Sequence, residues 1–243
     1  MQESPTGLEV GSLVGLWRYP VKSMAGEVLD AVEVSWHGLA GDRRWAFVRE
    51  GTERSGFPWL TLRERAEMSR FQPSFVDPAR PDRSDTTVRT PEGQTFDVVD
   101  PGLATRLAPD GARVIRQDRG NFDMFPLSLI TTATIAELSR RVGRELEVQR
   151  FRPNLVVHTN SEEPFAEDDW VGRELRIGTL RMRVDRRDGR CLVITLDPQS
   201  GERDPTVLRH VAQERDGCLG VYGSVVTPGN VAVGNAVVLL PKN

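Results

Sequence analysis

The stretch TVRTPEGQTFDVV, residues 87–99, predicts a β-hairpin. Polar and apolar residues alternate in both arms, and Pro91, Glu92 and Gly93 stand between them. Alternation on both sides of such a turn is typical of two antiparallel strands. Similar short runs, separated by Gly and Pro, recur through the N-terminal part of the chain and favour a sandwich or a barrel. The other strands expected there cover residues 13–23, 27–36, 43–50, 58–62 and 70–76.

The second part of the chain combines strands with helices. Residues 100–126 mix turns with one strand, and we expect the boundary between two small β-rich units there. The first predicted helix covers residues 131–143, where Thr134 and Glu137 have the spacing of a capping box and Gly143 suits the C-terminal end. The other expected elements are a helix over 204–216 and strands over 150–158, 174–178, 180–187, 191–196 and 231–240.

The overall charge argues against several partners. Charged residues make up 28% of the chain, the net charge is −3 and the pI is about 5.8. No overall basic field points to nucleic acid or to an acidic membrane, so any anion site must be local. The first ten residues lack the pattern of a secretory signal, and no run approaches the roughly 18 apolar residues of a membrane helix. The sequence therefore predicts a soluble, cytoplasmic protein.

Cysteine and lysine are both scarce. Cys191 and Cys218 are the only cysteines, and no Cys/His cluster suggests a zinc or iron–sulfur site. Lys22 and Lys242 are the only lysines among 32 basic residues. Two explanations of Lys22 stay open. The lysine could stand there by chance in an arginine-rich chain, or the position could require a compact ammonium group that a guanidinium cannot replace.

Polar residues gather in four short stretches beside apolar runs, at residues 19–23, 38–45, 151–154 and 188–191. Each stretch alone is a weak signal, because a cation at the end of a strand is usually on the surface. Together they would form a set of donors suited to a phosphate and to the polar edge of a heterocycle. These donors are Lys22, Ser23, Arg43, Arg152, Asn154 and Arg190.

Cys191 allows two interpretations. It could be a small apolar residue that opens the strand expected over 191–196. Alternatively, if Arg186, Arg187 and Arg190 converge on it, its thiolate would be stabilised. A thiolate is a soft ligand that suits metals such as molybdenum.

Five motifs in a fixed order give a more specific signal. They are YPVKS at 19–23, GDRRW at 41–45, FRPNLVV at 151–157, DDWVGRELRIG at 168–178 and RCLVITLDPQSG at 190–201. In these motifs the chain resembles the MOSC family. This family includes the C-terminal domain of molybdenum cofactor sulfurases, the bacterial proteins of the YcbX type and the amidoxime reducing components. The resemblance extends from Leu13 to Leu240. It implies a mainly β (α+β) fold, with an N-terminal MOSC β-barrel domain over 8–120 and a MOSC β-barrel with flanking helices over 121–243.

The resemblance also implies a molybdenum cofactor, Mo-molybdopterin, bound between the two domains. Cys191 matches the cysteine that ligates molybdenum and would be the catalytic position. The positions expected to contact the cofactor are Lys22, Ser23, Arg43, Asp123, Met124, Arg152, Asn154, Gly189, Arg190 and Tyr222.

Two departures from the family matter. Members of the amidoxime-reducing type often carry a second cysteine where this chain has Asp188. The YcbX type has a ferredoxin-like domain, whereas no cysteine cluster follows Cys218 here. We therefore expect a separate electron donor, such as a ferredoxin, a flavodoxin or a cytochrome-type reductase. Cys218 matches no ligand position and is expected to be a packed or surface thiol.

The function predicted first is an oxidoreductase that reduces N-hydroxylated small molecules by oxygen-atom transfer to molybdenum. Amidoximes, hydroxylamines and N-hydroxylated bases are the expected substrates. The alternative is a carrier of the cofactor or of sulfur that uses Cys191 without redox turnover. A Schiff base between Lys22 and pyridoxal phosphate is disfavoured, because in sulfurases that lysine belongs to a separate aminotransferase-like domain. A fourth interpretation is a β-rich protein whose basic residues are only surface charges.

Overall fold

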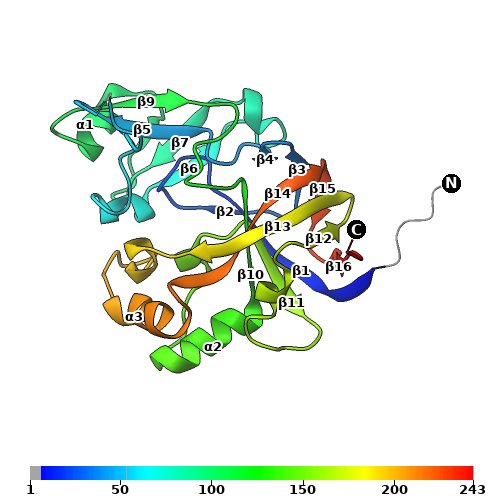
Figure 1. Ribbon diagram of the computed structural model, residues 1–243. Helices are drawn as coiled ribbons and strands as arrows, with labels where there is room; N and C mark the ends of the chain where they lie inside the picture. Colours follow the sequence, from blue (N-terminus) through cyan, green and yellow to red (C-terminus); the bar gives the residue numbers. More distant parts are fainter. Residues whose placement is uncertain (1–6, 53, 243) are drawn as a thin grey trace.

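The centre of the computed structural model, which describes residues 7–52 and 54–242, is a closed β-barrel (Figure 1). Its seven strands are β1 (Leu8–Arg18), β10 (Leu127–Thr131), β11 (Leu155–Thr159), β12 (Glu174–Ile177), β13 (Leu180–Gly189), β14 (Cys218–Thr227) and β16 (Ala236–Leu239). They follow one another in the order β11-β10-β14-β13-β12-β16-β1, and pairing of β1 with β11 closes the ring. The prediction of a mainly β fold is confirmed.

Strand β1 closes the barrel because it pairs on both of its edges. It is antiparallel to β11, with Leu13 opposite Val157, and antiparallel to β16, with Gly11 opposite Val237. A side chain at Gly11 would collide with the backbone of β11. The domain boundary between residues 120 and 121 stays a prediction, but β1, which precedes it in sequence, belongs to the barrel.

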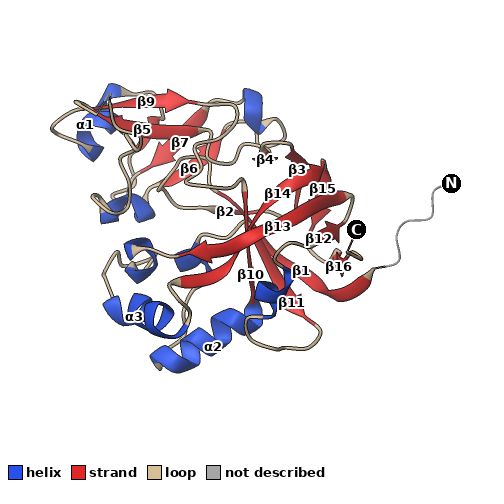
Figure 2. Cartoon of the chain, in the orientation of Figure 1, coloured by secondary structure: helices blue, strands red, loops and turns tan. Residues whose placement is uncertain are grey.

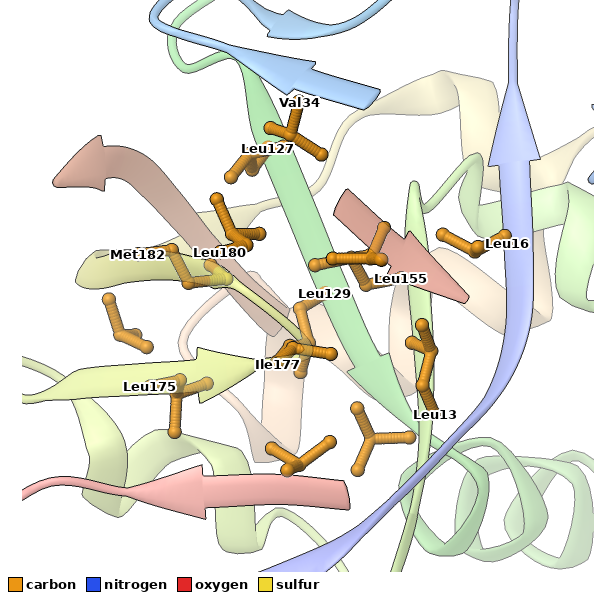
Figure 3. Close-up of a cluster of buried hydrophobic side chains, with 14 of the residues drawn as sticks. Leu13, Leu16, Val34, Leu127, Leu129, Leu155, Leu175, Ile177, Leu180 and Met182 are labelled. Atoms are coloured by element: carbon orange, nitrogen blue, oxygen red, sulfur yellow. The ribbon is translucent and has the colours of Figure 1, made fainter. Parts of the chain in front are cut away.

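The barrel is filled by aliphatic side chains from its strands. Figure 3 shows Leu13 and Leu16 of β1 facing Leu129 of β10 and Leu155 of β11. All four are completely buried, as β strands with one face in a core require.

The region from residue 19 to 119, here called the N-terminal unit, contains several small sheets. The predicted hairpin is present as β7 and β8, which pair with each other and with β6. A second sheet joins β3 and β4 to β15, which comes from the C-terminal part of the chain, and a third joins β5 and β9. Strand β2 pairs with the end of β1. The bounds are β2 Glu27–Val28, β3 Ala31–Ser35, β4 Gly38–Leu39, β5 Trp45–Arg49, β6 Gln72–Phe75, β7 Thr86–Arg89, β8 Thr95–Asp97, β9 Ala112–Arg116 and β15 Gly229–Ala232.

The two predicted helices are present as α2 (Thr132–Val142) and α3 (Pro205–Glu214), which lie side by side next to the barrel (Figure 2). The predicted capping box is wrong, because Thr131 caps α2 and accepts a hydrogen bond from the backbone of Thr134. Gly143 ends the helix with φ of 79°, as expected. In the described residues, no helix has the length and apolar character needed to cross a membrane.

Two predicted strands are wrong or incomplete, and three elements were missed. Residues 191–196 do not form a strand, because Leu192–Thr195 form a 3₁₀ turn in which the Thr195 hydroxyl donates to the Leu192 carbonyl. Residues 58–62 contribute only an isolated bridge at Trp59. Helix α1 (Pro101–Leu107), capped by Asp100, was not expected, and neither were β10 and β14. The remaining 3₁₀ turns are Ala66–Arg70, Pro81–Arg83, Val148–Phe151 and Ala166–Trp170.

Candidate functional site

A cavity of about 390 Å³ is lined by residues of both the N-terminal unit and the barrel. All eleven residues predicted for the site lie on its wall, although their roles stay predictions. They are Lys22, Ser23, Arg43, Asp123, Met124, Arg152, Asn154, Gly189, Arg190, Cys191 and Tyr222. The lining holds six cationic side chains and two carboxylates, which makes it a suitable place for an anion.

Three of these residues have a left-handed backbone. The φ angle is 69° at Ser23, 49° at Arg43 and 52° at Arg152. This conformation costs a non-glycine residue on the order of 1–3 kcal/mol, and such strain is found most often at functional sites. The surrounding structure holds it in place: the Arg43 amide donates to the Tyr19 carbonyl at 2.6 Å, and the Asn121 amide donates to the Arg43 carbonyl at 2.8 Å.

Lys22 is buried at the cavity wall. Its Nζ donates to the Asn121 carbonyl at 2.7 Å and forms an ion pair with Asp123. Burial lowers the pKa of Lys22, and the charge of Asp123 opposes this effect. For Asp123, burial would raise the pKa, but Lys22 and then Arg63 hold it below its ordinary value. Lys22 is therefore a fixed cation with one carboxylate partner.

Arg43 and Arg152 both pack on the buried ring of Tyr19. Their guanidinium carbons lie 4.6 and 4.2 Å from the ring centroid. Arg43 is ion-paired with Asp42, whereas Arg152 Nη1 donates to the Met24 carbonyl at 2.7 Å and its Nη2 is buried without a hydrogen-bond partner in the described residues. Burial, reinforced by the charge of Arg43, lowers the pKa of Arg152 to about 10. Burial raises the pKa of Tyr19 to about 12.

Asn154 joins the two parts of the cavity wall. Its Nδ2 donates to the Trp17 carbonyl and to Asp42, each at 3.1 Å. Its Oδ1 accepts from the backbone of Ser128 at 3.3 Å. Most of its hydrogen-bonding capacity is thus used to hold β1, β10 and the loop at residue 42 together.

Arg190 lies just beyond the end of β13. Its Nε donates to the Leu219 carbonyl and its Nη1 donates to the Phe151 carbonyl, both at 2.7 Å. Its Nη2 is 3.0 Å from Asp188 Oδ2. These contacts fix the turn that carries Gly189 and Cys191.

Cys191 contacts an arginine that the sequence did not indicate. Its Sγ lies 3.5 Å from Nη2 of Arg63, which belongs to the N-terminal unit. One interpretation of Cys191 required Arg186 and Arg187 to converge on the thiol, but neither of them lines the cavity. Arg187 is instead paired with Asp168 at 3.0 Å. No motif surrounds Arg63, so only the folded chain reveals it.

Aromatic residues cover another part of the wall. Phe125 and Tyr222 are stacked with centroids 5.9 Å apart and an interplanar angle of 28°. Burial, and then the charge of Asp188, raises the pKa of Tyr222. Met124, beside them, is 55% exposed. The predicted contact positions at Met124 and Tyr222 therefore add an apolar surface to the wall, with the Tyr222 hydroxyl close to Asp188.

Other candidate residues lie outside this site. Cys218 does not line the cavity; its Sγ is 3.7 Å from the Asp216 carbonyl, and it is partly exposed. Within residues 7–52 and 54–242, no group of three or more His, Cys, Asp or Glu side chains is arranged to hold a metal ion.

Comparison with known proteins gives the class to which this fold and cavity belong. Residues 116–238 match the MOSC domain, and residues 10–119 match the MOSC N-terminal beta barrel domain. The chain belongs to the MOSC family.

Relatives of known name are similar over most of the chain. The mitochondrial amidoxime reducing component 2 of Bos taurus is 24% identical over 94% of this chain and 83% of its own length. The molybdenum cofactor sulfurase of Drosophila mojavensis is 28% identical over 86% of this chain, which spans only 31% of that protein. The solved structure of the YuaD protein from Bacillus subtilis has a TM-score of 0.53 at 12% identity, covering 98% of this chain and 100% of its own. That last similarity concerns the fold alone.

Proposed function

We propose that this protein binds a molybdenum cofactor in the cavity beside Cys191 and reduces N-hydroxylated small molecules. The observation that supports this most directly is the position of a thiol on the wall of a cationic cavity in a MOSC-family chain. Relatives named as amidoxime reducing components support the class of reaction.

The residues present fit such a cofactor. Molybdopterin carries a phosphate, and Arg152 Nη2 is a buried donor without a partner in the described part of the chain. A buried donor of this kind is costly unless a ligand oxygen accepts from it. Lys22 and Arg43 add further charge, while Cys191 supplies the soft sulfur ligand that molybdenum favours.

Each group has a distinct task in this proposal. Arg152, Lys22 and Ser23 would hold the phosphate, and Asn154 would keep the wall rigid. Cys191 would ligate the metal, and Arg63 would fix the position of its sulfur. When bound, the cofactor supplies a metal that accepts an oxygen atom and is reduced again afterwards.

The reaction has a defined balance. The N–O bond of the substrate breaks, its oxygen leaves as water, and two electrons and two protons are consumed. A separate redox protein must deliver the electrons. We infer that the partner is a ferredoxin, a flavodoxin or a cytochrome-type reductase.

A carrier of cofactor or sulfur is the second candidate, and the sulfurase relatives favour it. In that role Cys191 would hold a sulfur atom or the metal without turnover.

Metal and pterin content will test the proposal. The protein should be purified from a cofactor-producing host as wild type, Cys191→Ala and the matched control Cys218→Ala. We expect near-stoichiometric molybdenum and pterin in the wild type and the control, and loss of the metal in Cys191→Ala. A wild type free of both metal and pterin would refute the proposal. A loaded protein that transfers its cofactor to an acceptor but reduces no N-hydroxylated compound would support the carrier instead.

A further inference from the structure

The two carboxylates on the cavity wall have different surroundings. Asp123 is shared between two cations: it forms an ion pair with Lys22 and lies 3.8 Å from Arg63. Asp188 is only 2% exposed and has one cationic partner, Arg190. Asp123 is thus neutralised by its neighbours, whereas Asp188 keeps part of its capacity to accept hydrogen bonds.

One oxygen of Asp188 is satisfied and the other is not. Oδ2 accepts from the hydroxyl of Ser128 at 3.1 Å and is 3.0 Å from Nη2 of Arg190. Oδ1 is buried and accepts no hydrogen bond within 3.5 Å in the described residues, and the hydroxyl of Tyr222 is the polar group that lies close to this carboxylate. A buried carboxylate oxygen without a donor carries an uncompensated desolvation cost, which a bound N–H group would remove.

The wall next to Asp188 suits a flat, apolar group. Tyr222 lies on β14, beside the strand that carries Asp188, and stacks on Phe125. Both rings line the cavity together with Met124. A ligand that places an N–H group on Asp188 can therefore place an aryl group on this aromatic surface.

We propose that Asp188 is a specificity-determining residue that accepts a hydrogen bond from an amino N–H group of the substrate. The inference rests on the proposed reductase function and narrows its substrates. Aryl amidoximes, which carry an NH₂ group next to the N–OH group, fit both the carboxylate and the aromatic wall. Compounds with the same N–OH group but no amino N–H lose this contact.

Two ligands distinguish a hydrogen bond to Asp188 from binding that does not depend on the amino N–H groups. Benzamidoxime has the amino N–H groups, and N,N-dimethylbenzamidoxime keeps the N–OH group without them. In Asp188→Asn, the amide oxygen should stay with the donors Ser128 and Arg190. The NH₂ group then takes the place of Oδ1. A hydrogen-bond donor of the protein faces the N–H donor of the ligand, so the hydrogen bond cannot form.

The experiment measures kcat and KM for both compounds with cofactor-loaded wild type, Asp188→Asn and the matched control Asp185→Asn from the same strand. For benzamidoxime we expect a KM at least about tenfold higher in Asp188→Asn, the size expected for loss of a charge-assisted hydrogen bond, with kcat nearly unchanged. The KM for N,N-dimethylbenzamidoxime should not change, and Asp185→Asn should match the wild type for both.

A second readout does not depend on turnover. Binding of benzamidoxime to cofactor-free protein, measured by calorimetry, should weaken by a similar factor in Asp188→Asn. Equal effects on the two compounds would overturn the inference, and so would loss of cofactor from Asp188→Asn, which would assign Asp188 to the cofactor. If the loaded wild type reduces neither compound, the reductase function fails, while the calorimetry still decides whether Asp188 binds the amino group.

Discussion

The guanidinium of Arg63 lies 3.5 Å from the sulfur of Cys191, although 128 residues separate them in the chain. Arg63 also packs on Phe57, with its guanidinium carbon 5.1 Å from the ring centroid, and lies 3.8 Å from Asp123. The N-terminal unit thus supplies the nearest charged neighbour of the thiol. The cavity is complete only when both parts of the chain are folded together.

Arg63→Ala should loosen the hold on Cys191 and on anything bound to it. We expect molybdenum to be lost several times faster during dialysis of the loaded protein, because the sulfur loses its hydrogen-bond donor. Arg63→Lys should lie between Arg63→Ala and wild type, since a point charge only partly replaces a guanidinium. Arg65→Ala, two residues away, is the control, and metal loss equal to that of Arg63→Ala would contradict this role.

Arg152→Ala should remove the main donor for a phosphate. We expect pterin content to fall at least about tenfold in protein from a cofactor-producing host, because a charge-assisted donor to phosphate is lost. Pterin fluorescence after release measures this. The exposed Arg83→Ala should retain its pterin, and full retention by Arg152→Ala would show that the phosphate lies elsewhere.

Tyr19 should matter for stability even without a cofactor. Replacing it with Leu removes the ring on which two guanidinium groups pack, and we expect a loss of about 2–4 kcal/mol in the free energy of unfolding. Tyr19→Phe loses only the hydrogen bond from the hydroxyl to the Pro153 carbonyl, at 3.2 Å, and should cost about 1 kcal/mol. Urea unfolding of cofactor-free protein will compare them; equal losses would mean that the ring contributes little.

Closure of the barrel should depend on the missing side chain at Gly11. A Cβ there would collide with the carbonyl of His158, so Gly11→Ala should destabilise the protein by about 1–3 kcal/mol. Gly56 has open space around it and gives the matched control Gly56→Ala. Thermal unfolding of both variants will test this. Equal stability of Gly11→Ala and Gly56→Ala would show that β1 and β11 can move apart at this point without a cost in stability.

Glu167 should give stability an unusual dependence on pH. It is fully buried at the start of α2, where it accepts hydrogen bonds from Thr131 and Thr134 but has no cation within 4.0 Å among the described residues. Burial raises its pKa above the ordinary 4.5, so the folded state keeps this proton to a higher pH than the unfolded state. The stabilising contribution of protonated Glu167 is therefore complete below about pH 4.5 and is lost as the pH rises through the raised pKa.

The test compares thermal unfolding of wild type and Glu167→Gln between pH 4.5 and pH 8. Relative to the variant, the wild type should become less stable as the pH rises. The exposed Glu163→Gln should show no such trend. A constant difference between wild type and Glu167→Gln would contradict the assignment.

The local spacing of apolar residues was enough to predict the helices and strands in which that spacing is regular. Helices α2 and α3 have an apolar stripe at helical spacing, and the hairpin of β7 and β8 has alternation around a Gly-bearing turn. The resemblance to the MOSC family also implied eleven residues that the fold brings to one cavity. These features lie within short stretches of sequence, which is why they could be recognised there.

The missed features depend on tertiary contacts. The apolar run at 191–196 cannot be distinguished from a buried turn by its composition, and it folds as a 3₁₀ turn with Ile194 in the core beside the helices. Strand β14 was not predicted because it contains Gly220 and Gly223, and glycine is uncommon inside strands. In the folded protein these glycines allow close approach of the neighbouring strands. Arg63 carries no local signal, because its importance comes from a loop that meets Cys191 only after folding.

The position of β1 in the barrel also constrains how the protein can be made. Residues 8–18 leave the ribosome long before their partners, since one edge of this strand pairs with β11 and the other with residues 236–239 of β16. One edge of β1 must therefore stay unpaired until residues 236–239 have been translated. Such an edge is prone to pair with other chains, so the speed of translation and protection by chaperones become determinants of the yield of folded protein.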